Sequence, residues 1–170
     1  MALLELLEYP DEALRQGSRP VQSFDSNLQG LVEDLKETLE SSGAIGLSAP
    51  QAGVFERVLV VHVPGDDYGL QVYINPEVLS AARLGFVEES CLSVPGVVGN
   101  VMRATRVHVR AQDATGQYFE RALEGMHAVC LQHEIDHLDG SLFIDKLSWY
   151  RRWRIKRAAE KEARAELAVS

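Results

Sequence analysis

Hydrophobic residues at helical spacing define the first clear element of the chain. Leucine and valine recur every three or four residues from Asn27 to Glu40, after Asp25 and Ser26, two residue types that cap helices. Residues 125–140 (GMHAVCLQHEIDHLDG) are helical in composition and end at a glycine, a frequent helix stop. A last helix is expected at about 149–167. The chain is therefore predicted to contain three helices, two of them late.

Short segments rich in β-branched residues predict strands between these helices. They are residues 57–63 (RVLVVHV), 70–76 (LQVYINP, stopped by Asn75 and Pro76), 88–96 (EESCLSVPG, ending in a Pro-Gly turn) and the two arms of a hairpin, 105–113 and 117–124. Residues 41–53 are expected to form an irregular loop, and residues 141–147 a brief extended link. Because the strands come mostly together, the order favours an α+β fold over a βαβ series.

Length and composition fit a single domain spanning residues 1–170. Hydrophobic residues make up 46% of the chain, which is typical of a protein with a buried core. The longest apolar run, VLVV at 58–61, is too short to cross a bilayer. The first ten residues lack a basic leader and carry Glu5 and Glu8, which argues against a signal peptide. Two cysteines make no disulfide framework, so a reduced, cytoplasmic setting is expected.

Charge is unevenly distributed along the chain. Residues 146–164 contain eight Lys and Arg residues against Glu160 and Glu162, a net +6, which leaves −14 for the rest of a chain whose total is −8. Such asymmetry indicates either an anionic partner for the last helix or an ordinary solvated helix face, and the sequence alone leaves both open.

The segment QHEIDHLDG, at 132–140, carries the clearest chemistry. His133 and His137 are four residues apart, so on a helix both imidazoles face one side and can bind one ion. Glu134 follows about 100° around the helix, where it can reach a water at the metal without binding the metal itself. This is the H-E-x-x-H pattern of metal hydrolases.

A catalytic ion of this kind needs a third protein ligand and an open position for water. A histidine six residues after the second one is excluded, because position 143 is Phe143. Glu160 and Glu162 are candidates but belong to the basic last helix. Cys130, one turn before the first histidine, and Cys91 are the remaining candidates, and their spacing does not decide between them.

Three separate motifs resemble those of the peptide deformylases, metal hydrolases that remove the formyl group from new protein N-termini. AIGLSAPQ at 44–51 resembles the family's glycine-rich motif, ESCLS at 89–93 resembles E-G-C-L-S, and QHEIDHLDG fits Q-H-E-x-D-H-L-x-G in full. Their order and spacing also agree. The segments YPDEALRQGSRPV, INPEV and LFIDKLS extend the resemblance over almost the whole chain.

The resemblance implies a ligand set and a fold. It selects Cys91, together with His133 and His137, as the metal ligands, and makes Cys130 a residue of the core or the pocket wall. It implies antiparallel β-sheets packed around a central helix that carries the histidines, followed by a C-terminal helix. The implied cofactor is one divalent metal ion, Fe²⁺, for which Zn²⁺, Ni²⁺ or Co²⁺ can substitute.

The resemblance also assigns roles around the implied ion. Glu134 is the proton carrier, and the oxyanion is stabilised by the side-chain amide of Gln51 and the backbone N–H of Leu92. Gly46 lets the backbone approach the substrate closely. The methionine side chain of the substrate enters an apolar pocket, for which the expected lining residues are Ile45, Met126, Val129 and the ring of His133.

Several residues depart from the family pattern. Ala44 replaces a glycine, Ser48 an alanine and Ser90 the glycine beside the cysteine, while Val98 and Gly99 stand where many relatives carry an arginine. None of these changes removes an implied ligand, the base or an oxyanion donor. They bear on efficiency and side-chain preference rather than on the type of reaction.

Other polar residues receive structural interpretations. Glu89 is expected to hold an arginine or a loop, and Asp136 either fixes a histidine tautomer or is an exposed helix charge. Arg103 and Arg106 are interpreted as a solvated strand face, with a role in binding as the alternative. His62 and His108 are taken as structural, and His127 does not share the face of the ligand pair.

The implied partners are N-formylmethionyl nascent peptides and, through the basic last helix, the ribosome near its exit tunnel. Ribosomal RNA suits a segment of charge +6. Trp149 and Trp153 are expected to anchor that helix to the body. DNA and membranes are not expected partners, and a monomer is expected. Two rival functions, a metallopeptidase and a non-catalytic binding protein, are disfavoured by the cysteine ligand and by the intact Gln51 and Glu134.

Overall fold

Five strands form one antiparallel sheet in which neighbouring strands follow the order of the sequence, β1-β2-β3-β4-β5. The computed structural model describes residues 2–169. The strands are β1 (Gly46–Ser48), β2 (Val58–Val61), β3 (Gln71–Cys91), β4 (Val94–Gln112) and β5 (Tyr118–Glu124). The helices are α1 (Ser26–Ser42), α2 (Gly125–Leu138) and α3 (Trp149–Val169), with short 3-10 helices η1 (Glu12–Arg15), η2 (Ala49–Ala52) and η3 (Phe143–Lys146). The expected α+β class is confirmed, with one sheet rather than several.

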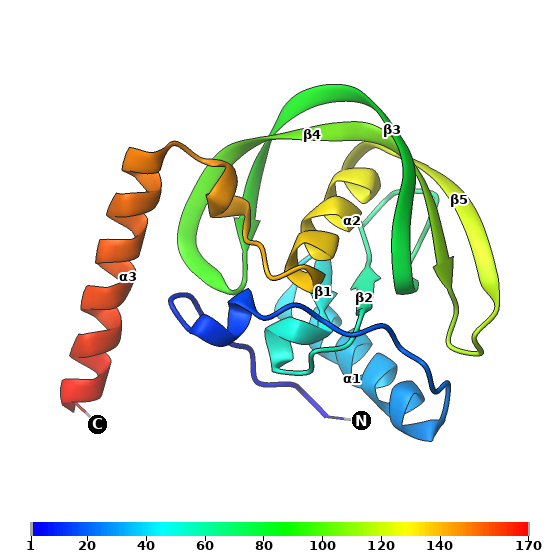
Figure 1. Cartoon of the computed structure of the whole chain (residues 1–170), viewed down its shortest axis with the longest axis horizontal. Coiled ribbons are helices and arrows are strands. Elements are labelled where there is room, and N and C mark those ends of the chain that lie inside the picture. Colours follow the sequence, from blue (N-terminus) through cyan, green and yellow to red (C-terminus); the bar gives the residue numbers. More distant parts are fainter. Residues whose placement is uncertain (1, 170) are drawn as a thin grey trace.

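Strands β3 and β4 form a long ribbon that arches over α2 (Figure 1). Cys91 pairs with Val94, so Leu92 and Ser93 occupy the tight turn between the two strands. The predicted turn at Pro95 and Gly96 is therefore wrong, because both residues lie within β4. This geometry places the turn, and Cys91 just before it, at one end of the ribbon.

The predicted strand end at Asn75 and Pro76 is also wrong. The register shifts between Ile74 and Glu77, and Asn75 takes a left-handed φ of 52°, so the strand absorbs the proline as an irregularity and continues. The Asn75 side chain holds this point, since its Oδ1 accepts from the backbone of Val21 at 2.8 Å. Two further expectations are corrected by local structure: the presumed loop 41–53 contains β1 and η2, and the presumed link 141–147 contains η3.

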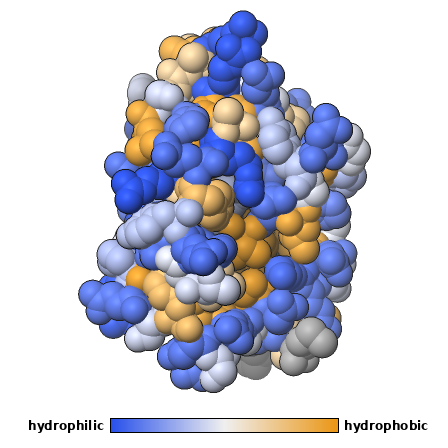
Figure 2. All heavy atoms as spheres, turned by 90° about the vertical axis from the view of Figure 1, so that its right-hand side faces the viewer, coloured by the Kyte–Doolittle hydropathy of each residue, from blue (hydrophilic) through white to orange (hydrophobic). Residues whose placement is uncertain are grey.

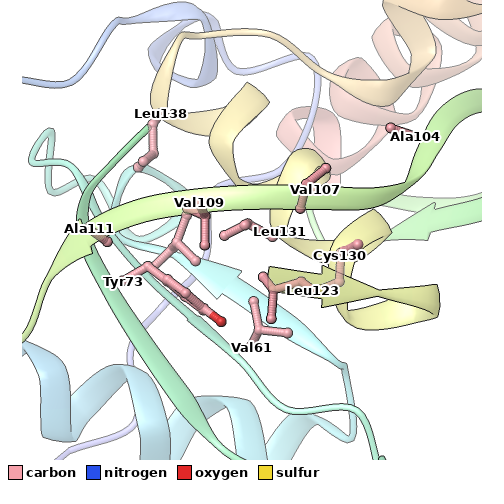
Figure 3. Close-up of a cluster of buried hydrophobic side chains, with 12 residues drawn as sticks. Val61, Tyr73, Ala104, Val107, Val109, Ala111, Leu123, Cys130, Leu131 and Leu138 are labelled. Atoms are coloured by element: carbon pink, nitrogen blue, oxygen red, sulfur yellow. The ribbon is translucent and has the colours of Figure 1, made fainter. Parts of the chain in front are cut away.

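Helix α2 packs against the sheet through one large apolar cluster (Figure 3). The periodicity expected for the β4–β5 hairpin is confirmed, because Val107, Val109 and Ala111 are all buried on one face. From the helix, Leu131 and Leu138 enter the same cluster. Burial of this apolar face fixes the rotation of α2 about its axis, and this sets the directions in which its polar side chains point.

Helix α1 covers a second cluster beside β2. Its expected apolar stripe is confirmed, and Asp25 caps the helix by accepting from the backbone N–H of Leu28 at 3.1 Å. Figure 2 shows hydrophobic side chains grouped in the middle of one face, with hydrophilic ones around them. None of the helices within residues 2–169 combines the length and apolar character that a membrane span requires.

Helix α3 lies to one side of the rest of the fold (Figure 1). None of its described residues is buried. The prediction that Trp149 and Trp153 anchor it is wrong, because they are 72% and 49% exposed. Ile155 instead packs against the buried cluster that contains Phe143 and Ile144, and Arg151 donates to the backbone oxygen of Val98.

Candidate metal centre and active site

Helix α2 and the end of β3 bring three metal-ligand side chains together. One donor atom from each of Cys91, His133 and His137 lies within 4.8 Å of the other two. The histidines project from successive turns of α2, with ring centroids 5.0 Å apart, and both are buried. Because they are four residues apart, the two histidines lie on one face of α2, and this face is turned toward Cys91 at the end of β3.

The donor set has the chemistry of a transition-metal site. Cys91 Sγ lies 3.2 Å from His137 Nε2, and His133 Nδ1 donates to Glu89 Oε1 at 2.8 Å, which leaves Nε2 of His133 available to an ion. Burial is the main cause that lowers the pKa of His137 well below its usual value, so its imidazole is neutral. A cysteine sulfur and two imidazole nitrogens form a donor set that suits Fe²⁺, Zn²⁺ and similar ions.

Glu89 orients His133 because its carboxylate is held ionised. Burial alone would raise its pKa, but hydrogen bonds from His133 and Arg103 outweigh burial and lower the pKa to about 2. An ionised carboxylate accepts a hydrogen bond from Nδ1–H, which keeps the proton on Nδ1 and so fixes the tautomer of the ring. The expectation that Glu89 holds an arginine is confirmed.

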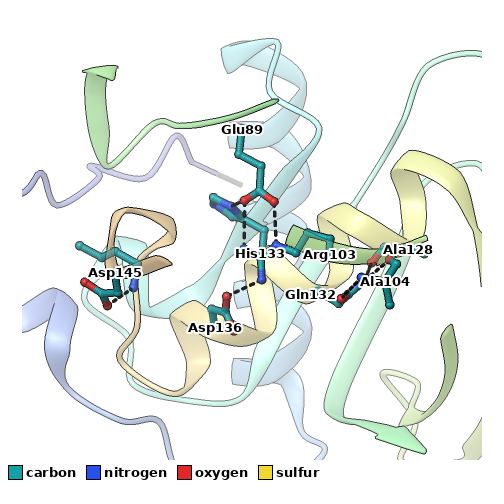
Figure 4. Close-up of polar contacts among 9 residues, drawn as sticks. Glu89, Arg103, Ala104, Ala128, Gln132, His133, Asp136 and Asp145 are labelled. Carbon is teal, nitrogen blue, oxygen red and sulfur yellow. Dashed lines mark hydrogen bonds and ion pairs between the residues drawn. The ribbon is translucent and has the colours of Figure 1, made fainter. Parts of the chain in front are cut away.

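Arg103 lies inside the protein, so its interpretation as part of a solvated strand face is wrong (Figure 4). It is 4% exposed and donates to Glu89 through Nε at 2.7 Å and Nη2 at 3.0 Å. A third bond, from Nη1 to Asp136 Oδ2 at 2.7 Å, ties β4 to α2. Asp136 therefore binds the arginine rather than a histidine. Arg106 remains on the exposed side and pairs with Glu124.

Glu134 lies beside the three donors and is buried. Burial raises its pKa to about 7, a value suited to giving and taking a proton near neutral pH. Its Oε1 has no hydrogen-bond partner within residues 2–169. A buried polar atom without a hydrogen-bond partner is unfavourable. Its presence beside the three donors fits a site that receives a ligand.

Gly46 permits the close approach of β1 to α2. A Cβ at this position would collide with Cys130 Sγ and lie 2.9 Å from Glu134 Oε2. A larger residue would require the Cys130 and Glu134 side chains to move, so glycine suits this position.

Gln51 and the β3–β4 turn complete the polar side of the site. Gln51 is buried, and its Nε2 lies 3.8 Å from Cys91 Sγ and donates to Ser93 Oγ at 3.1 Å. Leu92 occupies the turn directly after Cys91. Both expected oxyanion donors thus lie next to the cysteine.

A cavity of about 600 Å³ opens beside these groups. All of the residues expected to line the substrate pocket border it, namely Ile45, Gly46, Met126, Val129 and His133. Gln51, Leu92 and Glu134 border it as well. The apolar lining and the polar groups therefore share one cavity.

Within residues 2–169, the competing ligand candidates do not belong to the three-donor cluster, although Cys130 borders the same cavity. Cys130 is buried in the α2 core cluster next to Gly46, and burial raises its thiol pKa well above the usual value. Glu160 and Glu162 lie on α3. His127 bonds Tyr73 and Asp66 instead of facing the donors.

The residues that depart from the family pattern lie in different parts of the structure. Ala44 and Ser90 border the cavity, with the Ser90 residue exposed. Val98 is exposed. Ser48 is fully buried and hydrogen-bonded to Gln51, a contact that the motif alone did not predict.

Together, the arched antiparallel ribbon, the central H-E-x-x-H helix and the Cys-His-His donor set define a class of hydrolase. The family model for polypeptide deformylase matches residues 3–153. The chain belongs to the polypeptide deformylase family, a family of enzymes.

Relatives and solved structures agree over nearly the full length. Peptide deformylase 1 of Burkholderia multivorans is 45% identical over 97% of this chain and 92% of its own. A peptide deformylase structure from Legionella pneumophila superposes with a TM-score of 0.89 at 43% identity, covering 98% of both chains. The Ehrlichia chaffeensis peptide deformylase in complex with actinonin gives a TM-score of 0.89 at 34% identity, covering 95% of this chain and 98% of that one.

Proposed function

We propose that this enzyme is a metal-dependent hydrolase that removes the N-formyl group from the N-terminal formylmethionine of newly synthesised polypeptides and releases formate. The observation that carries the proposal is the convergence of Cys91, His133 and His137 beside Glu134, at the wall of a cavity with an apolar side. Membership of the polypeptide deformylase family supports the same reaction.

Cys91, His133 and His137 would hold one divalent ion. Fe²⁺ is the proposed working ion, and Zn²⁺, Ni²⁺ or Co²⁺ can substitute in the same donor set. A bound ion supplies a Lewis acid that lowers the pKa of water at the site and polarises the formyl carbonyl.

Glu134 moves the proton in this proposal. It takes a proton from the attacking water as the water oxygen bonds to the formyl carbon. The C–N bond then breaks, and Glu134 returns the proton to the leaving amine. The products are formate and a free amino terminus. The raised pKa of Glu134, about 7, supports a group that both accepts and gives the proton.

Gln51 and Leu92 stabilise the charge that develops on the formyl oxygen. The Nε2 of Gln51 points toward the cysteine side of the site, as its bond to Ser93 and its approach to Cys91 indicate. The backbone N–H of Leu92, in the turn, is the second donor. Preorganised donors of this kind contribute about 10²–10³ in turnover number each.

The apolar side of the cavity receives the methionine side chain. Val129 is buried behind it, while Met126 is 43% exposed at the wall. An unbranched thioether chain fits such an apolar pocket well. Ile45 and Gly46, from β1 and the segment before it, supply a further part of the wall.

Helix α3 is the proposed contact with the ribosome, in a monomeric cytoplasmic enzyme. Its exposed arginines and lysines suit phosphate groups of ribosomal RNA. Replacing Arg157 and Arg164 with glutamine should reduce co-sedimentation with ribosomes in a salt-dependent way, whereas Arg83→Gln, on β3, should not. Equal losses from both variants would contradict the assignment.

The reaction is tested by comparing two bonds in one substrate. Iron-loaded protein prepared without oxygen should release formate from a formyl-Met peptide and leave its peptide bonds intact. Glu134→Gln should keep the metal and lose most turnover. Peptide-bond cleavage without formate would indicate a metallopeptidase, and near-normal turnover of Glu134→Gln would remove Glu134 as the base.

A further inference from the structure

The side-chain amide of Gln51 is held in one orientation by two serines. Its Oε1 accepts two hydrogen bonds, each 3.0 Å long, from the backbone N–H and the hydroxyl of Ser48. Its Nε2 donates to Ser93 Oγ at 3.1 Å. Ser48 and Ser93 are both fully buried, so water does not compete for these bonds.

We infer that Ser48 is a positioning residue for the proposed reaction: beside its backbone N–H, its hydroxyl forms a second hydrogen bond that holds the Gln51 amide with the NH₂ group facing the substrate. The inference rests on the proposed oxyanion role of Gln51. Ser48 itself does not border the cavity and would act only through Gln51.

The chemistry of the amide makes its orientation decisive. A glutamine amide has nearly the same shape when its oxygen and nitrogen are exchanged, so hydrogen-bond partners must choose between the two. In the observed orientation both acceptor sites of Oε1 are used, and one N–H of Nε2 is bound to Ser93. The other N–H points toward the side of Cys91, 3.8 Å away, where an oxyanion would lie.

The reversed orientation is unfavourable at both ends. It would direct the amide oxygen at the Cys91 sulfur. It would also place the NH₂ group against the backbone N–H of Ser48, so that two donors face each other. A buried donor left without an acceptor destabilises that orientation. The backbone N–H, which can only donate, sets the orientation, and the Ser48 hydroxyl adds a second hydrogen bond that holds the amide in it. Alanine, which the family pattern has at this position, retains only the backbone donor.

Ser48 and Gln51 also form the capping box at the start of η2. A purely structural role would therefore lower stability when the hydroxyl is removed. The experiment must therefore distinguish a loss of stability from a loss of the Gln51 amide orientation.

Ser48→Ala should lower kcat about fivefold, the size expected from one neutral hydrogen bond, with KM unchanged. The metal content should also be unchanged. Ser18→Ala is the matched control, because the Ser18 hydroxyl is buried without a hydrogen-bond partner within the described residues. It should leave kcat unchanged. Ser48→Thr, which restores a hydroxyl, should recover turnover if it folds.

A double-mutant cycle with Gln51→Met decides the question. Methionine keeps the shape of the side chain but lacks the amide. If Ser48 acts through Gln51, adding Ser48→Ala to Gln51→Met causes no further loss in kcat. Two results would overturn the inference: an equal loss in kcat from Ser48→Ala with and without Gln51→Met, or no loss from Ser48→Ala when Gln51 is intact. If Gln51→Met itself keeps full kcat, the inference fails while formate release still supports the proposed function.

Discussion

Glu89 and His133 are joined by a hydrogen bond of 2.8 Å between Oε1 and Nδ1, and the same carboxylate is bound in two places by Arg103. The chain of contacts runs from β4 through β3 to the ring on α2. One ligand of the candidate metal centre is therefore oriented by the strands and not by its own helix alone.

Glu89→Gln is expected to weaken metal binding about 10- to 100-fold, because a neutral amide orients the His133 ring less strongly. Glu77→Gln, an exposed position on the same strand, should bind metal normally. Competition with a chelator, followed by metal analysis, measures both. Equal affinity in the two variants would mean that Glu89 does not support the site.

Arg103→Met should reduce the free energy of unfolding by about 3–5 kcal/mol, since it leaves two carboxylates without their buried partner. Arg106→Met is the matched control on the same strand, and its exposed pair with Glu124 contributes less than about 1 kcal/mol. Urea unfolding of metal-free protein measures both changes. Similar losses would contradict the burial of Arg103.

The two cysteines should respond differently to the same substitution. Cys91→Ala removes the sulfur donor of the candidate site, so the purified protein should contain little metal. Cys130→Ala removes a buried core sulfur next to Gly46 and should retain metal while losing some stability. Metal analysis after anaerobic purification distinguishes them, and the reverse pattern would exchange their roles.

Gly46→Ala should abolish most turnover, because the added methyl group collides with Cys130 and crowds Glu134. Gly30→Ala is the control for the same change. Gly30 lies in α1 with nothing within 4 Å of the new Cβ, and alanine there should add about 0.5–1 kcal/mol of stability. Turnover and thermal unfolding of both variants test the contrast. Full activity of Gly46→Ala would show that the close approach is not required.

The periodic parts of the fold could be predicted from the sequence, and the irregular parts could not. Spacing identified α1 and the β4–β5 hairpin, because each buries one regular face, and composition with a glycine stop identified α2. The β3–β4 ribbon was missed because Asn75 and Pro76 resemble a strand end, whereas the structure absorbs them through a register shift and side-chain hydrogen bonds.

The candidate site shows the same division. The histidine pair followed from helical spacing, while the choice of Cys91 depended on the family resemblance, because it meets α2 only through the tertiary fold. Arg103 was misplaced because a charged residue in a strand usually faces water. Its alternation with the buried Val101 was the available signal for an inward position. The Ser48–Gln51 bond had no signal in the pattern beyond its three-residue spacing.

The most direct test of the account loads metal-free protein with increasing amounts of Fe²⁺ in the absence of oxygen. Bound iron and formate released from a formyl-Met peptide are measured in the same samples. The account predicts that formate release rises in proportion to bound iron and stops rising when each chain holds one ion, with no such rise in Cys91→Ala. Formate release that does not depend on bound metal, or none at full loading, would contradict it.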